Sequence, residues 1–249
     1  MRGTRTLVLV GVIAYLGFAL AELPARQVFG WLAGELPAVA AGNVGGTLWS
    51  GHADDLAWRG ETVGTVHWRL RPIQLLRGRM EYALTWRGPL GQGRTRAGGS
   101  FGGWYLRELH AELAAGPIVR LVAGDPVRVR GALQADIQRV ELGDRYPRSA
   151  SGVVRWNHGE LVAPTAMALG SFDLKLQPAK PGVKGTLHDR GDGPLQVQGQ
   201  VSLTPKGAYR LSAAMDPRGA GGARLGSALQ YLGPRDGAGR YHLSLAGTL

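Results

Sequence analysis

The chain has 249 residues, 44% of them hydrophobic, which is enough for one large β domain or two smaller ones. It contains no cysteine, which excludes disulfides and thiolate metal sites. The net charge of +11 comes almost entirely from arginines spread along the chain. Charges on solvent-facing strand sides explain this balance, and a basic surface for nucleic acid or anionic lipid is the alternative. Because no recognition helix or base-stacking motif is present, we expect no nucleic-acid partner.

An uncharged apolar stretch follows two N-terminal arginines. Arg2 and Arg5 precede residues 7–21, which carry no charge. This length suits either a membrane anchor or the core of a cleaved signal peptide, with residues 19–21 as a small-x-small cleavage signature. We favour the anchor, and the arginines predict that its N-terminus stays in the cytoplasm. The expected anchor residues are Leu7, Val8, Leu9, Val10, Val12, Ile13, Leu16, Phe18 and Leu20.

Three short helices are expected in the rest of the chain. Apolar residues recur at helical spacing in 24–36, 117–123 and 223–232, and glycine or proline follows each segment. A large sheet with one apolar face must be covered by something, and these helices look too few to cover it.

Strands account for most of the remaining chain. In residues 64–70, Val66 and Trp68 alternate with polar residues, which is the period of a strand with one dry face and one wet face. Residues 78–87 repeat the alternation, with Glu81 on the wet face. The repeated unit is therefore a half-buried strand punctuated by glycine.

Later segments carry more specific strand signals. Residues 88–103 contain seven glycines, which predicts either a loose hairpin tip or a strand bent by glycine. The alternation in 127–142 changes phase, so we expect a bulge near Arg139. Residues 195–215 alternate on both sides of a glycine-containing turn, which predicts a hairpin. The run 240–249 has no proline or charge cluster, which makes it a candidate open edge; pairing between two other strands is the alternative.

Five tryptophans lie on or beside the apolar sides of these strands. Core packing is the plain explanation, because an indole ring buries a large area. A groove that grips a partner strand or lipid tails is the alternative. The five residues are Trp49, Trp58, Trp68, Trp86 and Trp156.

No motif in the chain indicates catalysis. Ser100 stands in a G-x-S-x-G string, but it lies in a glycine-rich segment before a strand, whereas a nucleophile elbow requires a strand-to-helix turn. His188, Asp189 and Asp192 are close enough in sequence to bind a metal, yet their segment has the composition of a turn. We therefore expect no enzymatic activity, no cofactor and no metal.

Several short motifs, in order, resemble the type II secretion system protein N family. They are GTLWSG at 46–51, G-x-V-x-W-R-L-x-P at 64–72, LLRGR at 75–79, GVVRW at 152–156, and the closing run 239–249. The resemblance covers nearly the whole chain. The family-motif residues, expected to serve in the core or an interface, are Gly46, Trp49, Gly51, Gly64, Trp68, Pro72, Gly78 and Trp156.

Together, the residues predict a mainly β protein: an N-terminal transmembrane helix, then an extended, curved, mostly antiparallel sheet with few short helices. The expected division is residues 1–23 for the cytoplasmic end and inner-membrane anchor and 24–249 for a periplasmic β-rich domain. The resemblance implies an accessory, non-catalytic subunit of the type II secretion system. Its implied partners are the lipid bilayer and other secretion subunits, namely the inner-membrane platform and the secretin. A periplasmic lipid-binding groove and an outer-membrane barrel are the alternatives.

Overall fold

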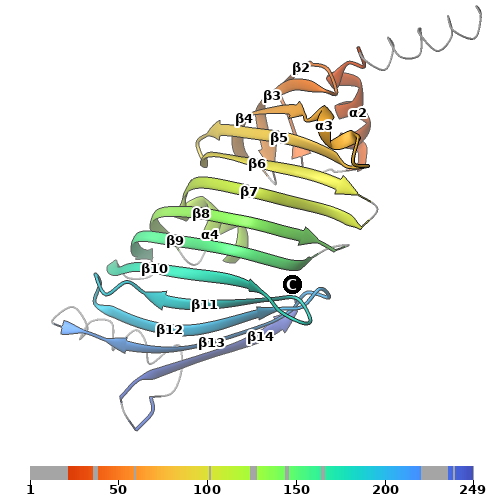
Figure 1. Cartoon of the computed structure of the whole chain (residues 1–249). Coiled ribbons are helices and arrows are strands. Elements are labelled where there is room, and N and C mark those ends of the chain that lie inside the picture. The colour runs from red at the N-terminus through yellow and green to blue at the C-terminus, as the bar shows by residue number, and fades with distance from the viewer. Residues whose placement is uncertain are drawn as a thin grey trace, which may run out of the picture.

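The chain forms one antiparallel sheet of fourteen strands that follow one another along a single axis (Figure 1). The computed structural model describes residues 22–35, 39–58, 60–100, 102–123, 128–143, 146–163, 166–219, 235–237 and 239–248. Both β1 and β2 pair with β3, and from β3 to β14 each strand pairs with the next along the chain. The strands are β1 (Val39–Ala40), β2 (Asn43–Gly46), β3 (Ser50–Trp58), β4 (Glu61–Leu70), β5 (Met80–Gly88), β6 (Gly91–Ser100), β7 (Gly103–Ala114), β8 (Arg128–Leu142), β9 (Pro147–Ala163), β10 (Met167–Pro178), β11 (Val183–Asp189), β12 (Leu195–Leu203), β13 (Ala208–Pro217) and β14 (Tyr241–Thr248).

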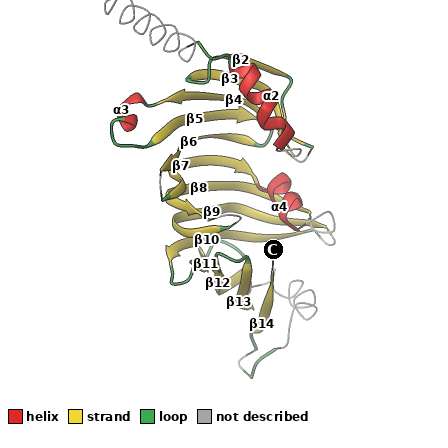
Figure 2. Cartoon of the chain, turned by 90° about the vertical axis from the view of Figure 1, so that its right-hand side faces the viewer, coloured by secondary structure: helices red, strands yellow, loops and turns green. Residues whose placement is uncertain are grey.

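Three short helices accompany the sheet in the part of the chain that the structure describes: α2 (Ala25–Glu35), α3 (Pro72–Leu75) and α4 (Ala115–Ala123). The helices α2 and α4 lie on one side of the sheet and α3 on the other (Figure 2). Both α2 and α4 were expected from the sequence, whereas α3 was not. None of the described helices is both long enough and apolar enough to cross a membrane. The expected anchor and the expected helix at 223–232 lie outside the described residues.

The mainly β architecture expected from the sequence is confirmed, as an open sheet. Strands β1 and β14 stand at opposite ends of the strand order and, among the described residues, do not pair with each other. The sheet is therefore open in the part of the chain that the structure describes. The glycine-rich segment at 88–103 contains a complete strand, β6, rather than a loose tip.

Two local predictions are confirmed in the second half of the sheet. The register of β8 against β9 shifts between Ile137 and Arg139, where the phase of the sequence changes. Strands β12 and β13 form the expected hairpin, and the Gly207 N–H donates to the Thr204 carbonyl at 3.0 Å in its turn.

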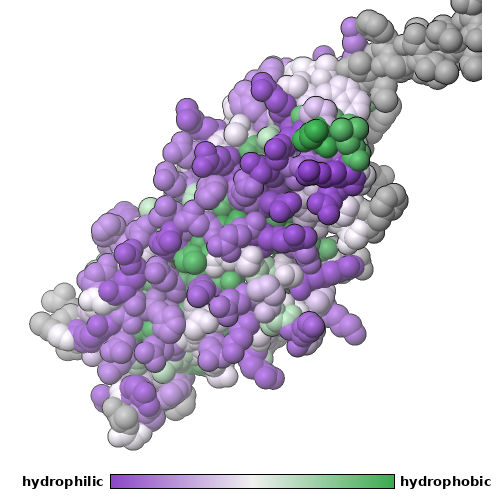
Figure 3. Space-filling view, in the orientation of Figure 1, coloured by the Kyte–Doolittle hydropathy of each residue, from purple (hydrophilic) through white to green (hydrophobic). Residues whose placement is uncertain are grey.

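The two faces of the sheet differ in chemistry because cross-strand partners point to the same face. One face carries apolar pairs such as Trp68–Leu84, Leu133–Trp156 and Leu211–Leu245. The other face carries polar side chains, and the view in Figure 3 is accordingly mostly hydrophilic. The apolar face lies on the side of α2, whose Val28 and Phe29 line a pocket with Trp68.

Large aromatic side chains on this sheet lie across glycines of the neighbouring strand. A Cβ built on Gly51 would stand 2.6 Å from the ring of Trp68, and one on Gly93 would stand 2.2 Å from the ring of Trp86. Both are direct cross-strand partners. These glycines therefore make room for a flat ring inside a strand, a role beyond turn formation. The same arrangement recurs in the pairs Gly98–Tyr105, Gly99–Trp104 and Gly247–Tyr209.

The best buried apolar cluster lies near the C-terminal end of the sheet. Phe172, Val197, Met215 and Tyr241 belong to it, and Trp156 packs against it with its ring centroid 5.7 Å from that of Phe172. Trp156 therefore packs against this cluster as a partly buried residue.

We expect Trp68→Ala to lower the free energy of unfolding by about 3 kcal/mol, because the indole packs over Gly51 and the Thr47 carbonyl would lose the hydrogen bond that it accepts from the indole N–H. Thermal melting of the full chain measures this. Trp104→Ala is the matched control: this indole is 66% exposed and also lies over a glycine, so little change is expected. Equal losses in both variants would contradict the structural role of Trp68.

Candidate interaction site at the N-terminal end of the sheet

The turn at 46–51 joins the start of the described chain to the sheet. Its Thr47 carbonyl accepts a hydrogen bond from the Trp68 indole N–H at 3.1 Å. The N–H of Leu48 donates to the carbonyl of Leu23 at 2.9 Å, and Pro24 bridges to Thr47. The turn therefore fastens the segment that enters α2 onto β3 and β4.

Two glycines make this turn possible. Gly46 has φ +83°, and a Cβ there would stand 2.5 Å from the Ser50 carbonyl oxygen. Gly51 leaves room for the ring of Trp68, as described above. A side chain at Gly46 would collide with Ser50 and Gly51 at the start of β3, and one at Gly51 would collide with the ring of Trp68 on β4. The GTLWSG string is thus a structural joint, and its central Trp49 directs its carbonyl to the Leu70 N–H at 2.6 Å.

An apolar pocket of about 500 Å³ lies between α2 and the first strands. Helix α2 supplies three of its lining residues, the turn at 46–51 supplies Leu48, and the strands supply the others. The lining residues are Ala25, Val28, Phe29, Val39, Leu48, Ala53, Leu56, Val66, Trp68, Met80, Tyr82 and Trp104. The apolar side of the helix and the apolar face of the strands thus enclose this pocket between them.

A buried ion pair fixes the loop that carries α3. Glu81 is 1% exposed, and its carboxylate accepts hydrogen bonds from Arg71 at 2.8 Å and from the Tyr105 hydroxyl at 3.1 Å. Burial is the main cause that raises the pKa of Tyr105, and the hydrogen bond to Glu81 is the second. This hydroxyl therefore stays protonated and donates. The sequence placed Glu81 on a wet strand face. That expectation was wrong, because Arg71 and Tyr105 cover the carboxylate.

The remaining motif residues are not all gathered here. Gly64 has φ +105° in β4 and lies against the backbone of Arg87, Pro72 begins α3, and Gly78, with φ +66°, ends the loop that follows it. Trp156 lies on β9, far along the strand order, where its indole N–H donates to the Arg130 carbonyl at 3.1 Å. The motif therefore marks one joint at the N-terminal end and a separate core position.

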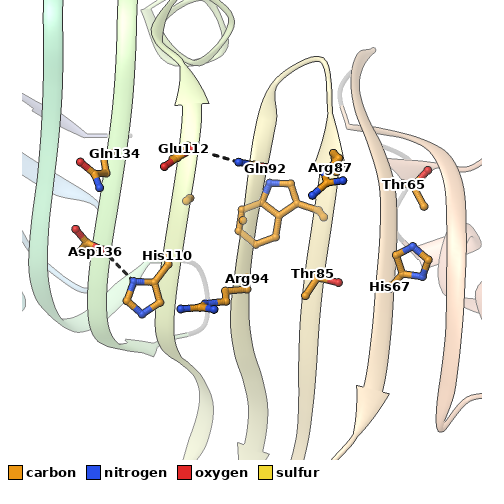
Figure 4. A pocket seen from close by; sticks show the side chains of 13 residues that line it. Thr65, His67, Thr85, Arg87, Gln92, Arg94, His110, Glu112, Gln134 and Asp136 are labelled. Atoms are coloured by element: carbon orange, nitrogen blue, oxygen red, sulfur yellow. Dashed lines mark hydrogen bonds and ion pairs between the residues drawn. The ribbon is translucent and has the colours of Figure 1, made fainter.

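The polar face carries a hollow of about 880 Å³ across β4 to β8 (Figure 4). In it, Asp136 accepts hydrogen bonds from His110 at 2.9 Å and from Arg155 at 2.5 Å. These two interactions, His110 first, lower the pKa of Asp136, which is therefore a carboxylate at neutral pH. No sequence motif predicts this cluster, because its members lie on different strands and meet only through the strand register.

The candidate chemical residues do not form a reaction centre. Ser100 ends β6 at the turn into β7, and its hydroxyl accepts the Gly102 N–H at 3.3 Å. Asp192 accepts the Ser171 N–H at 2.8 Å, and its hydrogen bonds with Ser171 lower its pKa. Asp189 accepts the N–H groups of Gly191 and Val197, as expected of a turn-forming aspartate. Among the described residues, no group of three or more His, Cys, Asp or Glu side chains could hold a metal ion.

Comparison with known proteins decides the family. The family model for type II secretion system (T2SS), protein N, matches residues 37–244. The chain belongs to the type II secretion system protein N family. It is therefore a component of the type II secretion system, as the motif resemblance implied.

Individual protein N relatives match over most of their length. The chain is 27% identical to type II secretion system protein N of Aeromonas hydrophila, over 96% of each chain. It is 30% identical to that of Vibrio cholerae serotype O1 over 82% of each chain, and 26% identical to that of Klebsiella pneumoniae over 96% of this chain and 94% of the relative. No solved structure matches the chain.

Proposed function

We propose that this protein N family member is a non-catalytic scaffold subunit, anchored in the inner membrane and extended into the periplasm, where it contacts other secretion subunits. The observation that carries the proposal is the architecture: the described residues form one open sheet that ends in β14, and no group of three or more of their His, Cys, Asp or Glu side chains could hold a metal ion. Such a sheet offers long surfaces for assembly and no enclosed site for chemistry. The inner-membrane platform is the expected partner, and the secretin is a further one.

The anchor rests on Arg2, Arg5 and the uncharged residues 7–21. The turn at 46–51 supports it, because it ties Leu23 to the sheet immediately after that stretch. We expect protein extracted from membranes to retain its complete N-terminus, as measured by intact mass. A mature N-terminus at Glu22 would contradict the anchor.

The proposed partner contact is strand addition at the outer edge of β14. This strand is the last in the sheet order, and the one described pairing on its outer side is the bridge between Arg235 and Tyr241. It contains no proline and no lysine that would protect an edge. Unpaired strand edges recruit extended segments of other chains through backbone hydrogen bonds.

The backbone of β14 shows which residues face outward. Both the N–H and the carbonyl of Arg240 point away from β13, toward Asp236, at 2.9 Å and 2.8 Å. Because backbone groups alternate sides along a strand, the N–H groups of His242 and Ser244 point the same way. Those of Leu243 and Leu245 point toward β13.

We therefore expect Ser244→Pro to leave the protein folded and to abolish its co-purification with the secretion platform, since proline removes one outward donor. Ser244→Ala controls for the lost hydroxyl, and Leu245→Pro, which removes an inward donor, should disrupt the β13–β14 pairing. Thermal melting and affinity purification from membranes measure both properties. Normal platform recovery by folded Ser244→Pro would refute strand addition here.

A second candidate function, lipid binding, is favoured by the apolar pocket under α2. Its occupant would be an acyl chain of a membrane lipid, because the pocket adjoins the segment that follows the proposed anchor. Val28→Trp should fill the pocket and remove most of the phospholipid that native mass spectrometry detects on the full chain. Arg26→Trp, an exposed position of the same helix, is the control. Lipid retention by both variants would contradict this candidate.

A further inference from the structure

Residues 71–79, which join β4 to β5 and contain α3, form the α3 loop, and this loop presents large apolar side chains to solvent. Leu76 is 84% exposed and Ile73 is 56% exposed, and Leu75 beside them is also exposed. Figure 3 shows a compact hydrophobic patch at the place that α3 occupies in Figure 1. Three neighbouring exposed aliphatic residues on a short loop are unusual for a soluble surface and indicate a contact.

Positive charge surrounds this patch. Residues 69–80 contain four arginines and no acidic residue. Arg71 is engaged by Glu81, whereas Arg77 and Arg79 are exposed and form no ion pair with the residues that the structure describes. Aliphatic side chains flanked by free arginines complement an anionic lipid surface, which offers phosphates at the level of the charges and acyl chains below them.

The loop is held in one conformation. The Arg71 N–H donates to the Glu81 carbonyl at 2.8 Å, in addition to the side-chain ion pair. Within the loop, the Gly78 N–H donates to the Leu75 carbonyl at 2.9 Å and the Arg79 N–H to the Gln74 carbonyl at 3.0 Å. The exposed aliphatic residues are thus displayed by an ordered loop.

The loop also lies at the membrane-proximal end that our proposed function assigns to this sheet. It connects β4 to β5, two strands whose Val66, Trp68 and Met80 line the α2 pocket. The exposed Trp104 lies near the end of this loop. It pairs with Gly99, and Gly99 pairs with Met80, the first residue of β5. Tryptophan side chains are favoured at the lipid headgroup level.

We propose that the α3 loop docks into the headgroup layer of an anionic bilayer, with Ile73, Leu75 and Leu76 inserted and Arg77 and Arg79 on the phosphates. This inference rests on the proposed function and adds to it a second membrane contact. With the anchor alone, the sheet could pivot about one point. With two contacts, its long axis is held in a defined direction relative to the membrane.

The absence of native cysteine makes a direct test simple. Leu76→Cys in the full chain takes an environment-sensitive fluorophore, and Lys206→Cys, in the exposed β12–β13 turn, is the control. The labelled chains are reconstituted into vesicles of phosphatidylcholine with or without phosphatidylglycerol. In vesicles containing phosphatidylglycerol, we expect a blue-shifted emission at position 76, quenched by spin-labelled lipid, and water-like emission at position 206.

A charge-reversed variant of the labelled chain distinguishes insertion of the loop into the bilayer from mere proximity to it. Arg77→Glu with Arg79→Glu should remove the blue shift and the quenching at position 76. Chain that floats with the vesicles while position 76 behaves like position 206 would overturn the docking but leave the anchor standing. Chain that fails to float contradicts both. Shielding of position 76 that requires other secretion subunits would assign the patch to a protein partner and overturn the inference.

Discussion

A single layer of strands must bury its apolar side chains against itself, and the rest of this structure follows from that constraint. In a two-layer protein the facing layer covers the apolar side. Here the described helices cover small parts of it, and aromatic rings lie flat across glycines of adjacent strands instead. The pairs Gly51–Trp68 and Gly93–Trp86 show how a ring gains a packing surface where a side chain would exclude it. Some of the glycines within strands thus make room for aromatic side chains of the adjacent strand.

The two ends of the sheet differ in the contacts that hold them. At the N-terminal end, hydrogen bonds of the 46–51 turn tie the segment that enters α2 to the first strands, and the Arg71–Glu81 ion pair holds the α3 loop against β5. The C-terminal end has a buried cluster around Phe172 and Met215, and its last strand, β14, contains no proline or lysine that would protect the edge. A chain built this way suits a role as a connector, held at one end and open to strand pairing at the other.

Much of the fold could be predicted because alternation is a local signal. The hairpin at 195–215, the bulge in β8 and the two helices α2 and α4 all follow from spacing within a short window. The sequence did not decide whether residues 88–103 form a strand or a loose hairpin tip, because glycines show no alternation of apolar and polar side chains. The aromatic residues that pack over these glycines lie on neighbouring strands and are identified only by the register. The burial of Glu81 and the Asp136 cluster could not be found for the same reason: each depends on cross-strand register. The GTLWSG string was expected to serve in the core or an interface, and its contact with Leu23 is seen only in three dimensions.

We propose that the open edge of β14, rather than a face of the sheet, engages the secretion machinery. Site-specific photo-crosslinking in cells distinguishes these two surfaces, with a benzoylphenylalanine at Ser244 and another at Ser212. These two exposed residues are cross-strand partners on the same face, but β13 is paired on both sides and β14 ends the sheet. If the partner adds to the edge of β14, we expect an adduct with another secretion subunit from position 244 and none from position 212. Equal adducts from both positions, or adducts from position 212 alone, would show instead that the partner binds the face of the sheet.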